Sequence, residues 1–213
     1  VKVTTAADEN DAGATPAAPG GTGLSLREAI KYVNGLGFSA TIQFDEAFFA
    51  SPTTANVLSS LPALTRNGAL VVGRPQVTLD FTGASLSGTN NPCLRLGGDN
   101  QGLYRLRVVG CAGTAVVTDH DGAVVAESTV VGAAGSTGIL ALHPATIGPR
   151  NDVSGGATGI VVRNGGNGCT VEGNRVHGNG VGVQIDNTDN AAVQGNFVYG
   201  NSSHGIQLLN SKS

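Results

Sequence analysis

A repeat of about 22 residues in the C-terminal half is the feature that most constrains the fold. The stretch from Val171 to Asn179 returns as Val193 to Asn201, with apolar residues and Gly-Asn pairs at matching places. Counted backwards, one valine of this unit recurs at steps of 22, 23, 23 and 22 along the chain. This valine column is Val198, Val176, Val153, Val130 and Val108. A nearly constant step over several units indicates stacked, equivalent coils of a solenoid.

Each unit contains three short apolar segments separated by Gly and Asn, and two further columns keep the same step. They are a first column of Leu103, Val125, Ile147, Val171 and Val193 and a third column of Val116, Ile139, Ile160, Val183 and Ile206. Short segments with alternating apolar and polar residues are typical of strands, and Gly and Asn between them favour tight bends. Hexapeptide periodicity, typical of left-handed helices, is missing. The sequence therefore predicts an all-β fold: a right-handed, single-stranded parallel β-helix with three sheets.

Asparagines occupy two more columns at fixed places in the coils. Asn151, Asn174 and Asn196 precede the second strand, and Asn164, Asn187 and Asn210 close the third. Asn tolerates the left-handed conformation at a bend, and its amide can bond the same amide in the next coil. We interpret both columns as structural asparagine ladders.

Composition agrees with a β-rich chain and excludes several classes of protein. Glycine makes up 33 of 213 residues and charged residues only 13%, which disfavours a helix-rich domain. The net charge of −3 leaves no basic surface for nucleic acid. Apolar runs are too short to span a membrane. The first residues lack the order of a signal peptide, so export would imply a leader already removed.

The N-terminal third contains one clear helical pattern. Leu26, Ile30 and Val33 recur at helical spacing, and Ser25 with Glu28 forms a capping-box motif. We expect residues 1–66 to be a cap segment, with a helix over 25–34 that covers the first coil and irregular strands after it. Residues 67–213 are expected to form the coils, which continue beyond the chain end or are capped by a partner subunit, since no capping pattern follows the last strand.

Three N-terminal motifs, together with the repeats, resemble a known family. The motifs are Val3–Asp8 (VTTAAD), Leu24–Ile30 (LSLREAI) and Thr41–Asp45 (TIQFD). They are similar to the start of CSLREA-domain proteins, bacterial proteins that are secreted or anchored at the cell surface, in which this segment leads into a pectate-lyase-like β-helix. Leu24 replaces the usual Cys, so the disulfide of that cap cannot form. The resemblance implies the fold and export, and it leaves the activity open.

By the same resemblance, a substrate groove would run over the sheet of the third column. Alternation turns the third-column residues inward and their successors outward. The outward residues are Leu140, Val161, Gln184 and Gln207, followed two positions on by Leu142, Arg163, Asp186 and Leu209. Arg163 and Asp186 in adjacent coils favour a structural ion pair, with catalysis or substrate binding as the alternative. The apolar outward residues are expected to be covered by a loop, a tail or a partner. The candidate substrate-binding residues are His143, Arg163, Gln184, Asp186 and Gln207.

The densest polar cluster follows the strand of Val116. Asp119, His120 and Asp121 could form an acid/base pair, and this cluster resembles the Asp-rich tetrad of alginate epimerases. Thr118 and Asp119 depart from that motif, and the register at Val116 is open by one residue. A solvated polar turn is the favoured interpretation, and these three residues stay catalytic candidates beside Arg163 and Asp186.

The sequence indicates neither a metal site nor a cofactor. The alternative to this expectation is a calcium ion held between coils by Asp186, Asp189 and Glu172. His177 and Tyr199 share an outward column on the second sheet. Because the sequence shows no acid or metal partner for them, we interpret them as exposed side chains without a functional role.

The three cysteines allow one disulfide at most. Cys93 and Cys111 are less than one repeat apart and could lie in neighbouring coils, where they could pair. Buried free thiols are the favoured interpretation, including for Cys169.

Two functional hypotheses follow, besides a silent stalk. The leading one is a secreted or cell-surface domain that acts as a binding, adhesin-like or spacer module for polysaccharide or a surface protein. The alternative is a carbohydrate-active enzyme, a lyase, epimerase or hydrolase of acidic polysaccharide. Sparse catalytic groups favour binding. The few aromatic residues, with no Trp among them, disfavour sugar stacking under either hypothesis and give weight to a protein partner.

Overall fold

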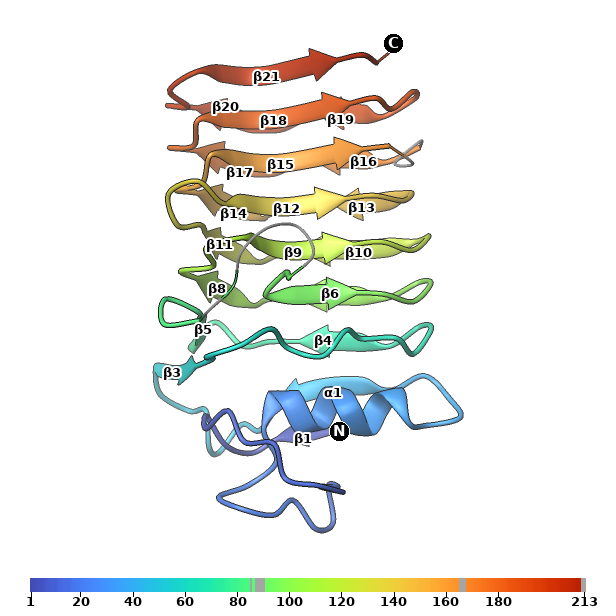
Figure 1. The fold of residues 1–213 in the computed structure, drawn as a ribbon, viewed down its shortest axis with the longest axis vertical. Coiled ribbons are helices and arrows are strands. Elements are labelled where there is room, and N and C mark those ends of the chain that lie inside the picture. The colour runs from blue at the N-terminus through green and yellow to red at the C-terminus, as the bar shows by residue number, and fades with distance from the viewer. Residues whose placement is uncertain (85, 87–90, 165–167, 212–213) are drawn as a thin grey trace.

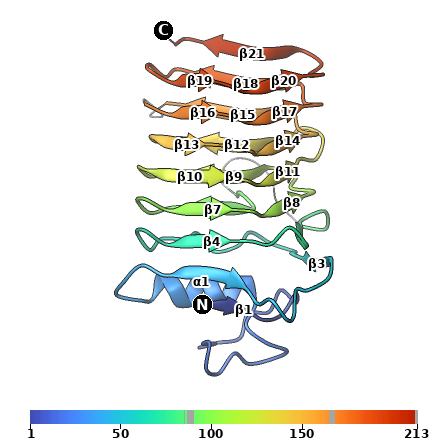
Figure 2. The same cartoon turned by 180° about the vertical axis from the view of Figure 1, so that it is seen from behind.

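The chain folds into a right-handed parallel β-helix. The computed structural model describes residues 1–84, 86, 91–164 and 168–211, and within them three parallel sheets contain eight, seven and six strands. Figure 1 shows the coils stacked along one axis, with the two chain termini at opposite ends of the solenoid. Figure 2 shows the same stack from behind. The predicted all-β, right-handed solenoid with a short N-terminal helix is therefore confirmed.

Each regular coil contributes one short strand to each sheet. The first sheet contains β1 (Lys2–Val3), β2 (Thr41–Phe44), β4 (Leu70–Val72), β7 (Gly102–Tyr104), β10 (Ala123–Ala126), β13 (Ala145–Ile147), β16 (Thr170–Glu172) and β19 (Ala192–Gln194). The second contains β3 (Thr53–Asn56), β5 (Val77–Asp80), β8 (Arg107–Val109), β11 (Thr129–Val131), β14 (Asp152–Ser154), β17 (Arg175–His177) and β20 (Phe197–Tyr199). The third contains β6 (Leu94–Leu96), β9 (Thr114–Thr118), β12 (Thr137–Ala141), β15 (Thr158–Arg163), β18 (Val181–Asp186) and β21 (His204–Leu209).

The three apolar columns of the repeat stack in register inside the solenoid. Val153 pairs with Val130 and Val176, and Ile160 pairs with Ile139 and Val183. These side chains are fully buried in one continuous core. Burial of about 25 cal/mol per Å² of apolar surface makes these columns the main source of stability.

The core opens to solvent in the last coil of the structure. Ile206 and Leu208, on the inner side of β21, are 50% and 66% exposed. A partner subunit or further coils over these residues stays a prediction.

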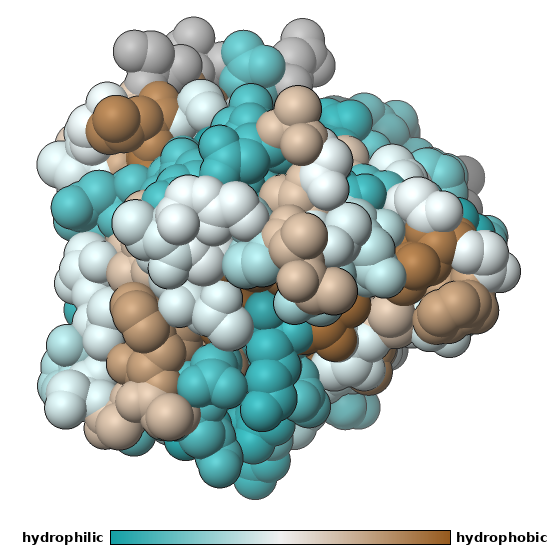
Figure 3. Space-filling model, turned by 90° about the horizontal axis from the view of Figure 1, so that it is seen from below, coloured by the Kyte–Doolittle hydropathy of each residue, from teal (hydrophilic) through white to brown (hydrophobic). Residues whose placement is uncertain are grey.

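Helix α1 (Leu26–Asn34) closes the other end of the core. Ser25 caps it, its hydroxyl accepting from the Glu28 amide while the Glu28 carboxylate accepts from the Ser25 amide. Arg27 anchors the helix through two bonds of 2.8 Å to Asp8 and one to the carbonyl of Ser60. Figure 3, seen from this end, shows hydrophilic and weakly polar residues over most of the surface, with hydrophobic residues in separate patches. The cap thus shields the apolar columns from water.

The first coils depart from the regular step because loops interrupt them. From Thr41 the pairing passes to Leu70 and then to Gly102, and both of these steps are longer than those of the later coils. Cys93 and Cys111 form a disulfide in this region, with Cα atoms 6.2 Å apart. The expectation of free thiols is therefore wrong for these two cysteines. The amide of Cys93, directly before β6, donates to the carbonyl of Thr114 at the start of β9, which places Cys93 beside the coil of Cys111. Cys169 is free and buried.

The part of the chain that the structure describes holds no helix with the length and apolar character needed to cross a bilayer.

Candidate functional site

The third sheet presents a line of polar side chains on its outer face. Val116 lies in register with Ile139 and is fully buried, which fixes the direction of every residue in β9. Thr118 therefore points inward, and Asp119 begins the outward row beyond the strand. We call this line the outer strip. It consists of Arg95, Asp119, His120, Asp121, His143, Arg163, Gln184, Asp186 and Gln207.

Asp119 links two basic groups at the lower end of the strip. Its carboxylate lies 3.1 Å from Nη1 of Arg95 on β6 and 3.2 Å from Nδ1 of His120. Asp119 is partly buried, whereas His120 is exposed. The carboxylate is thus placed to orient the imidazole of His120, a side chain that is open to solvent. Sequence reasoning named Asp119 and His120 but missed Arg95, which lies one coil earlier on the same face.

Asp121 and His143 form a second acid–imidazole pair across adjacent coils. Nδ1 of His143 lies 3.2 Å from the Asp121 carboxylate, and both side chains are exposed. The rings of His120 and His143 stack, with centroids 6.1 Å apart and planes inclined by 21°. The structure therefore brings the whole polar turn after β9 together with His143.

Arg163 and Asp186 form an ion pair at the upper end of the strip. They are register partners at the ends of β15 and β18, and Nε of Arg163 lies 3.0 Å from Oδ2 of Asp186. Gln184 and Gln207 stand beside this pair as register partners of β18 and β21. Because strands in a sheet are about 4.8 Å apart and Leu142 intervenes, the pair lies roughly 10 Å from Asp119. The two ends of the strip therefore form separate groups.

Apolar outward residues form a second cluster between these polar groups. Val117, Leu140 and Val161 are at most 3% exposed and Leu142 packs against them, outside the main core. The outward Leu140 and Val161 are thus shielded from solvent, and cover of this face by a loop, a tail or a partner stays a prediction.

The asparagine columns bond from coil to coil. Nδ2 of Asn151 donates to Oδ1 of Asn174 at 2.9 Å, and Asn174 donates to Asn196 at 3.0 Å. Asn164, Asn187 and Asn210 all have positive φ, and Asn187 donates to Asn164. A third ladder, Asn179 to Asn201, was missed, although both residues follow glycine in the repeat unit. These amides are engaged with each other and with the backbone, as structural residues are.

A group of carboxylates lies in the N-terminal cap. Within the described residues, one group places three potential ligand atoms within 4.8 Å, and it consists of Glu9, Asp11 and Glu28 in the cap. Glu28 already accepts hydrogen bonds from the amides of Asp11 and Ser25. Its carboxylate therefore serves the cap. The alternative of calcium held by Asp186, Asp189 and Glu172 stays a prediction.

The second sheet carries a further histidine with an acid partner. Nε2 of His177 lies 2.9 Å from Asp152 one coil earlier, and its ring stacks on Tyr199 with centroids 5.0 Å apart. Arg175 bonds the Tyr199 hydroxyl, which raises the pKa of the Arg175 guanidinium. The expectation that His177 has no acid partner is wrong, because Asp152 reaches it across coils.

Comparison with known proteins supports the fold. A family model described as "right handed beta helix region" matches residues 92–213. Among solved structures, pectate lyase Pel9A is similar with a TM-score of 0.61 and 13% identity, covering 99% of this chain, which spans 62% of the lyase. The A-module of mannuronan C-5 epimerase AlgE6 from Azotobacter vinelandii matches at a TM-score of 0.38 and 13% identity, over 86% of this chain and 74% of the module. No curated protein matches the sequence.

Proposed function

We propose that this chain, which belongs to the right-handed β-helix family, is an exported domain that binds polysaccharide along the outer strip. The observation that carries the proposal is a pair of hydrogen-bonding groups on one face of the solenoid, one around Asp119 and His143 and the other formed by Arg163, Asp186 and the two glutamines. Export is supported by the resemblance of the N-terminal motifs to CSLREA-domain proteins.

The geometry of the strip suits an extended glycan. Strands repeat about every 4.8 Å along the solenoid, a distance comparable to the advance of a glycan chain per sugar. The carboxylates, imidazoles and amides of the two polar groups supply hydrogen-bond donors and acceptors for two stretches of hydroxyl groups, with the apolar cluster between them. Within the strip, Arg95 pairs with Asp119 and Arg163 with Asp186, so both cations are already neutralised. This pairing favours recognition of sugar hydroxyls over neutralisation of a polyanion.

One observation favours a second function, cleavage or epimerisation of polysaccharide. A carboxylate that accepts from Nδ1–H of a histidine leaves Nε2 as the basic nitrogen, which is the arrangement of a general base. Asp119 and His120 have this arrangement at 3.2 Å, with His120 open to solvent. Arg95 would then hold the Asp119 carboxylate in place as a positioning residue.

The test is incubation of the protein with a panel of neutral and acidic polysaccharides, following both retention on the polymer and the polymer's chain length. Retention without shortening supports the binding module. Shortened or epimerised chains support the catalytic function instead. Neither effect with any polymer refutes both and points to a surface-protein partner or a spacer.

Two variants localise the result. His120→Gln removes the Asp119–His120 pair, one of the two acid–imidazole pairs of the strip, whereas His177→Gln removes a comparable Asp–His pair on the second sheet. We expect His120→Gln to weaken retention, or to abolish turnover if there is any, and His177→Gln to leave both unchanged. Equal effects of the two variants would refute the assignment of the strip.

A further inference from the structure

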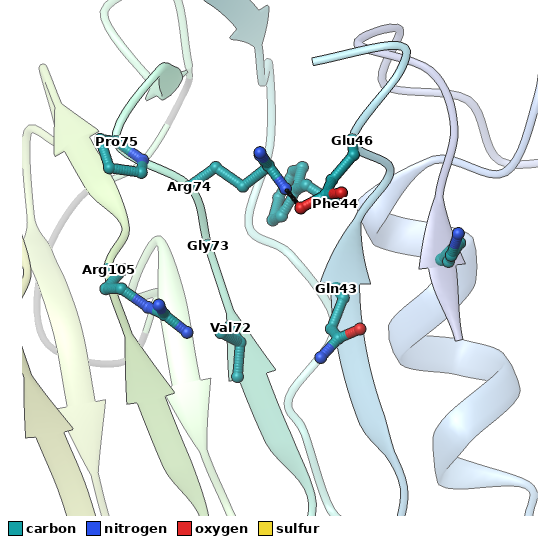
Figure 4. A pocket seen from close by; sticks show the side chains of 9 residues that line it. Gln43, Phe44, Glu46, Val72, Gly73, Arg74, Pro75 and Arg105 are labelled. Carbon is teal, nitrogen blue, oxygen red and sulfur yellow. Dashed lines mark hydrogen bonds and ion pairs between the residues drawn. The ribbon is translucent and has the colours of Figure 1, made fainter. Parts of the chain in front are cut away.

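We propose that a cavity at the corner between the first and second sheets is a binding site for a carboxylate-bearing sugar, a hexuronate unit. The site is distinct from the outer strip, and the choice of a sugar ligand rests on the proposed function. The cavity measures about 470 Å³ and lies over the first coils of the solenoid. Figure 4 shows the side chains of β2, of the turn after β4 and of the residue after β7 arranged around it.

The lining is cationic although the chain is acidic. Three cations, Lys2, Arg74 and Arg105, line the cavity with one carboxylate, Glu46. Lys2 pairs with Asp45 at 3.3 Å and Arg74 with Glu46, so the excess positive charge is that of Arg105. The whole chain carries a formal net charge of −3. A concave site with an excess of positive charge concentrates anions.

Arg105 is the cation that has no partner. Among the described residues it makes neither an ion pair nor a side-chain hydrogen bond, and Figure 4 shows its guanidinium directed toward Val72. Its backbone φ is +53°, a left-handed conformation that costs a non-glycine residue free energy. The guanidinium of this exposed residue is therefore free to bind an anionic ligand in the cavity.

Later coils have equivalent residues at the same corner, and these leave no charge unpaired. The equivalent residues also have positive φ, and they are Glu127, Arg150, Gly173 and Gly195. Two are glycine, for which this conformation is favourable. Glu127 and Arg150 form an ion pair with each other. Arg105 alone in this column keeps an uncompensated charge at the cavity.

Arg74 supplies a second set of donors. Its Nη1 donates to Glu46 at 2.9 Å, and this contact lowers the pKa of the Glu46 carboxyl below its ordinary value. Nε of Arg74 is buried and makes no hydrogen bond within the described part of the chain. Guanidinium groups bind carboxylates with two parallel bonds, so Arg74 and Arg105 together suit a carboxylate better than a neutral hydroxyl.

The remaining lining fits a sugar ring rather than a bare inorganic anion. Val72, Pro75 and the edge of Phe44 provide an apolar surface against which the C–H face of a pyranose can pack. Gln43 adds an amide for ring hydroxyls. Gly73 keeps the turn tight, because a Cβ there would clash with the carbonyl oxygen of Arg105. A cavity lined by apolar side chains, an amide and two guanidinium groups matches a hexuronate.

The test measures binding of uronate trimers by isothermal titration calorimetry, using the galacturonate, mannuronate and glucuronate trimers and the methyl ester of each. We expect at least one acidic trimer to bind and its ester to bind at least tenfold more weakly, since a charged hydrogen-bond network is lost. No binding by any trimer, or equal binding by acid and ester, would overturn the proposal.

Three variants localise the site. Arg105→Gln is expected to weaken the trimer tenfold or more, whereas Arg107→Gln, on the exposed side of neighbouring β8, is the matched control and should change nothing. Glu46→Gln removes the carboxylate that competes for Arg74 and should tighten binding severalfold, a gain that a misfolded variant could not give. Equal effects of Arg105→Gln and Arg107→Gln would overturn the assignment.

The outcome also separates this site from the outer strip. His120→Gln should leave trimer binding unchanged while it affects retention on polymer. If trimers bind through Arg105 and no polymer is retained, the cavity is a uronate site and the proposed function of the outer strip is refuted. If polymer is retained and no trimer binds through Arg105, the proposal for the cavity alone is refuted.

Discussion

The buried amide ladder makes a quantitative prediction through Asn174. Its side chain is 2% exposed. Nδ2 donates to the Ile147 carbonyl at 2.8 Å and to Asn196 at 3.0 Å, and Oδ1 accepts from the side chain and the backbone amide of Asn151. Asn174→Ala therefore removes the partners of several groups that stay out of water.

The expected loss follows from these contacts. A typical intramolecular hydrogen bond contributes about 1 kcal/mol, and each buried group left without a partner costs roughly 1–3 kcal/mol. We expect Asn174→Ala to lower the free energy of unfolding by about 3–4 kcal/mol. Urea denaturation followed by circular dichroism measures this as an earlier midpoint at unchanged slope.

Asn187→Ala is the matched control, because it truncates the same residue type in the exposed ladder. Asn187 donates one side-chain hydrogen bond, of 3.1 Å to Asn164, and has a φ of +50°. Its loss should be only about 1 kcal/mol, mostly from the left-handed backbone. If Asn174→Ala cost no more than Asn187→Ala, buried amide stacking would not be what holds this corner.

Three further predictions concern the cysteines and the strip. Cys111→Ser removes the disulfide to Cys93, at a sequence separation of 18, and should lower the free energy of unfolding by about 3 kcal/mol; identical urea midpoints with and without reductant in the wild type would contradict this. Burial raises the pKa of the Cys169 thiol, so Ellman's reagent at about pH 8 should label it only after unfolding, and rapid labelling of the native protein would show otherwise. Arg163 and Asp186 are partly exposed, so a double-mutant cycle with Arg163→Gln and Asp186→Asn should give a coupling of at most about 1 kcal/mol, and a value above about 2 kcal/mol would rule out a surface pair.

The regular coils were predictable because in-register stacking turns a spatial period into a sequence period. A residue that sits above its counterpart in the previous coil must recur after one coil length, as Val153 does between Val130 and Val176. The capping box at Ser25 and Glu28 was equally local, since it depends on two residues within one helical turn. Both signals need no knowledge of distant contacts.

The remaining features depend on contacts that follow no fixed step. Loops lengthen the early coils, so no periodic argument places Arg74 next to Glu46 or Arg105 beside the turn of Gly73. The disulfide joins Cys93 to Cys111 at a sequence separation of 18, which does not match the repeat, so no periodic argument pairs them. The direction of Asp119 was open because the register at Val116 was fixed only by pairing with its neighbours in the sheet.

In-register stacking also determines which changes of length the molecule can absorb during evolution. Each regular coil contacts mainly the coils before and after it. Its three strands pair with the equivalent strands of both neighbours. Duplication or loss of one repeat unit would move whole coils along the axis and restore every pairing. Insertion of a single residue within a strand would instead turn the following side chains of that strand to the opposite face. Changes of whole units are therefore the ones this lineage is expected to tolerate, with the length of the rod varying and its cross-section kept.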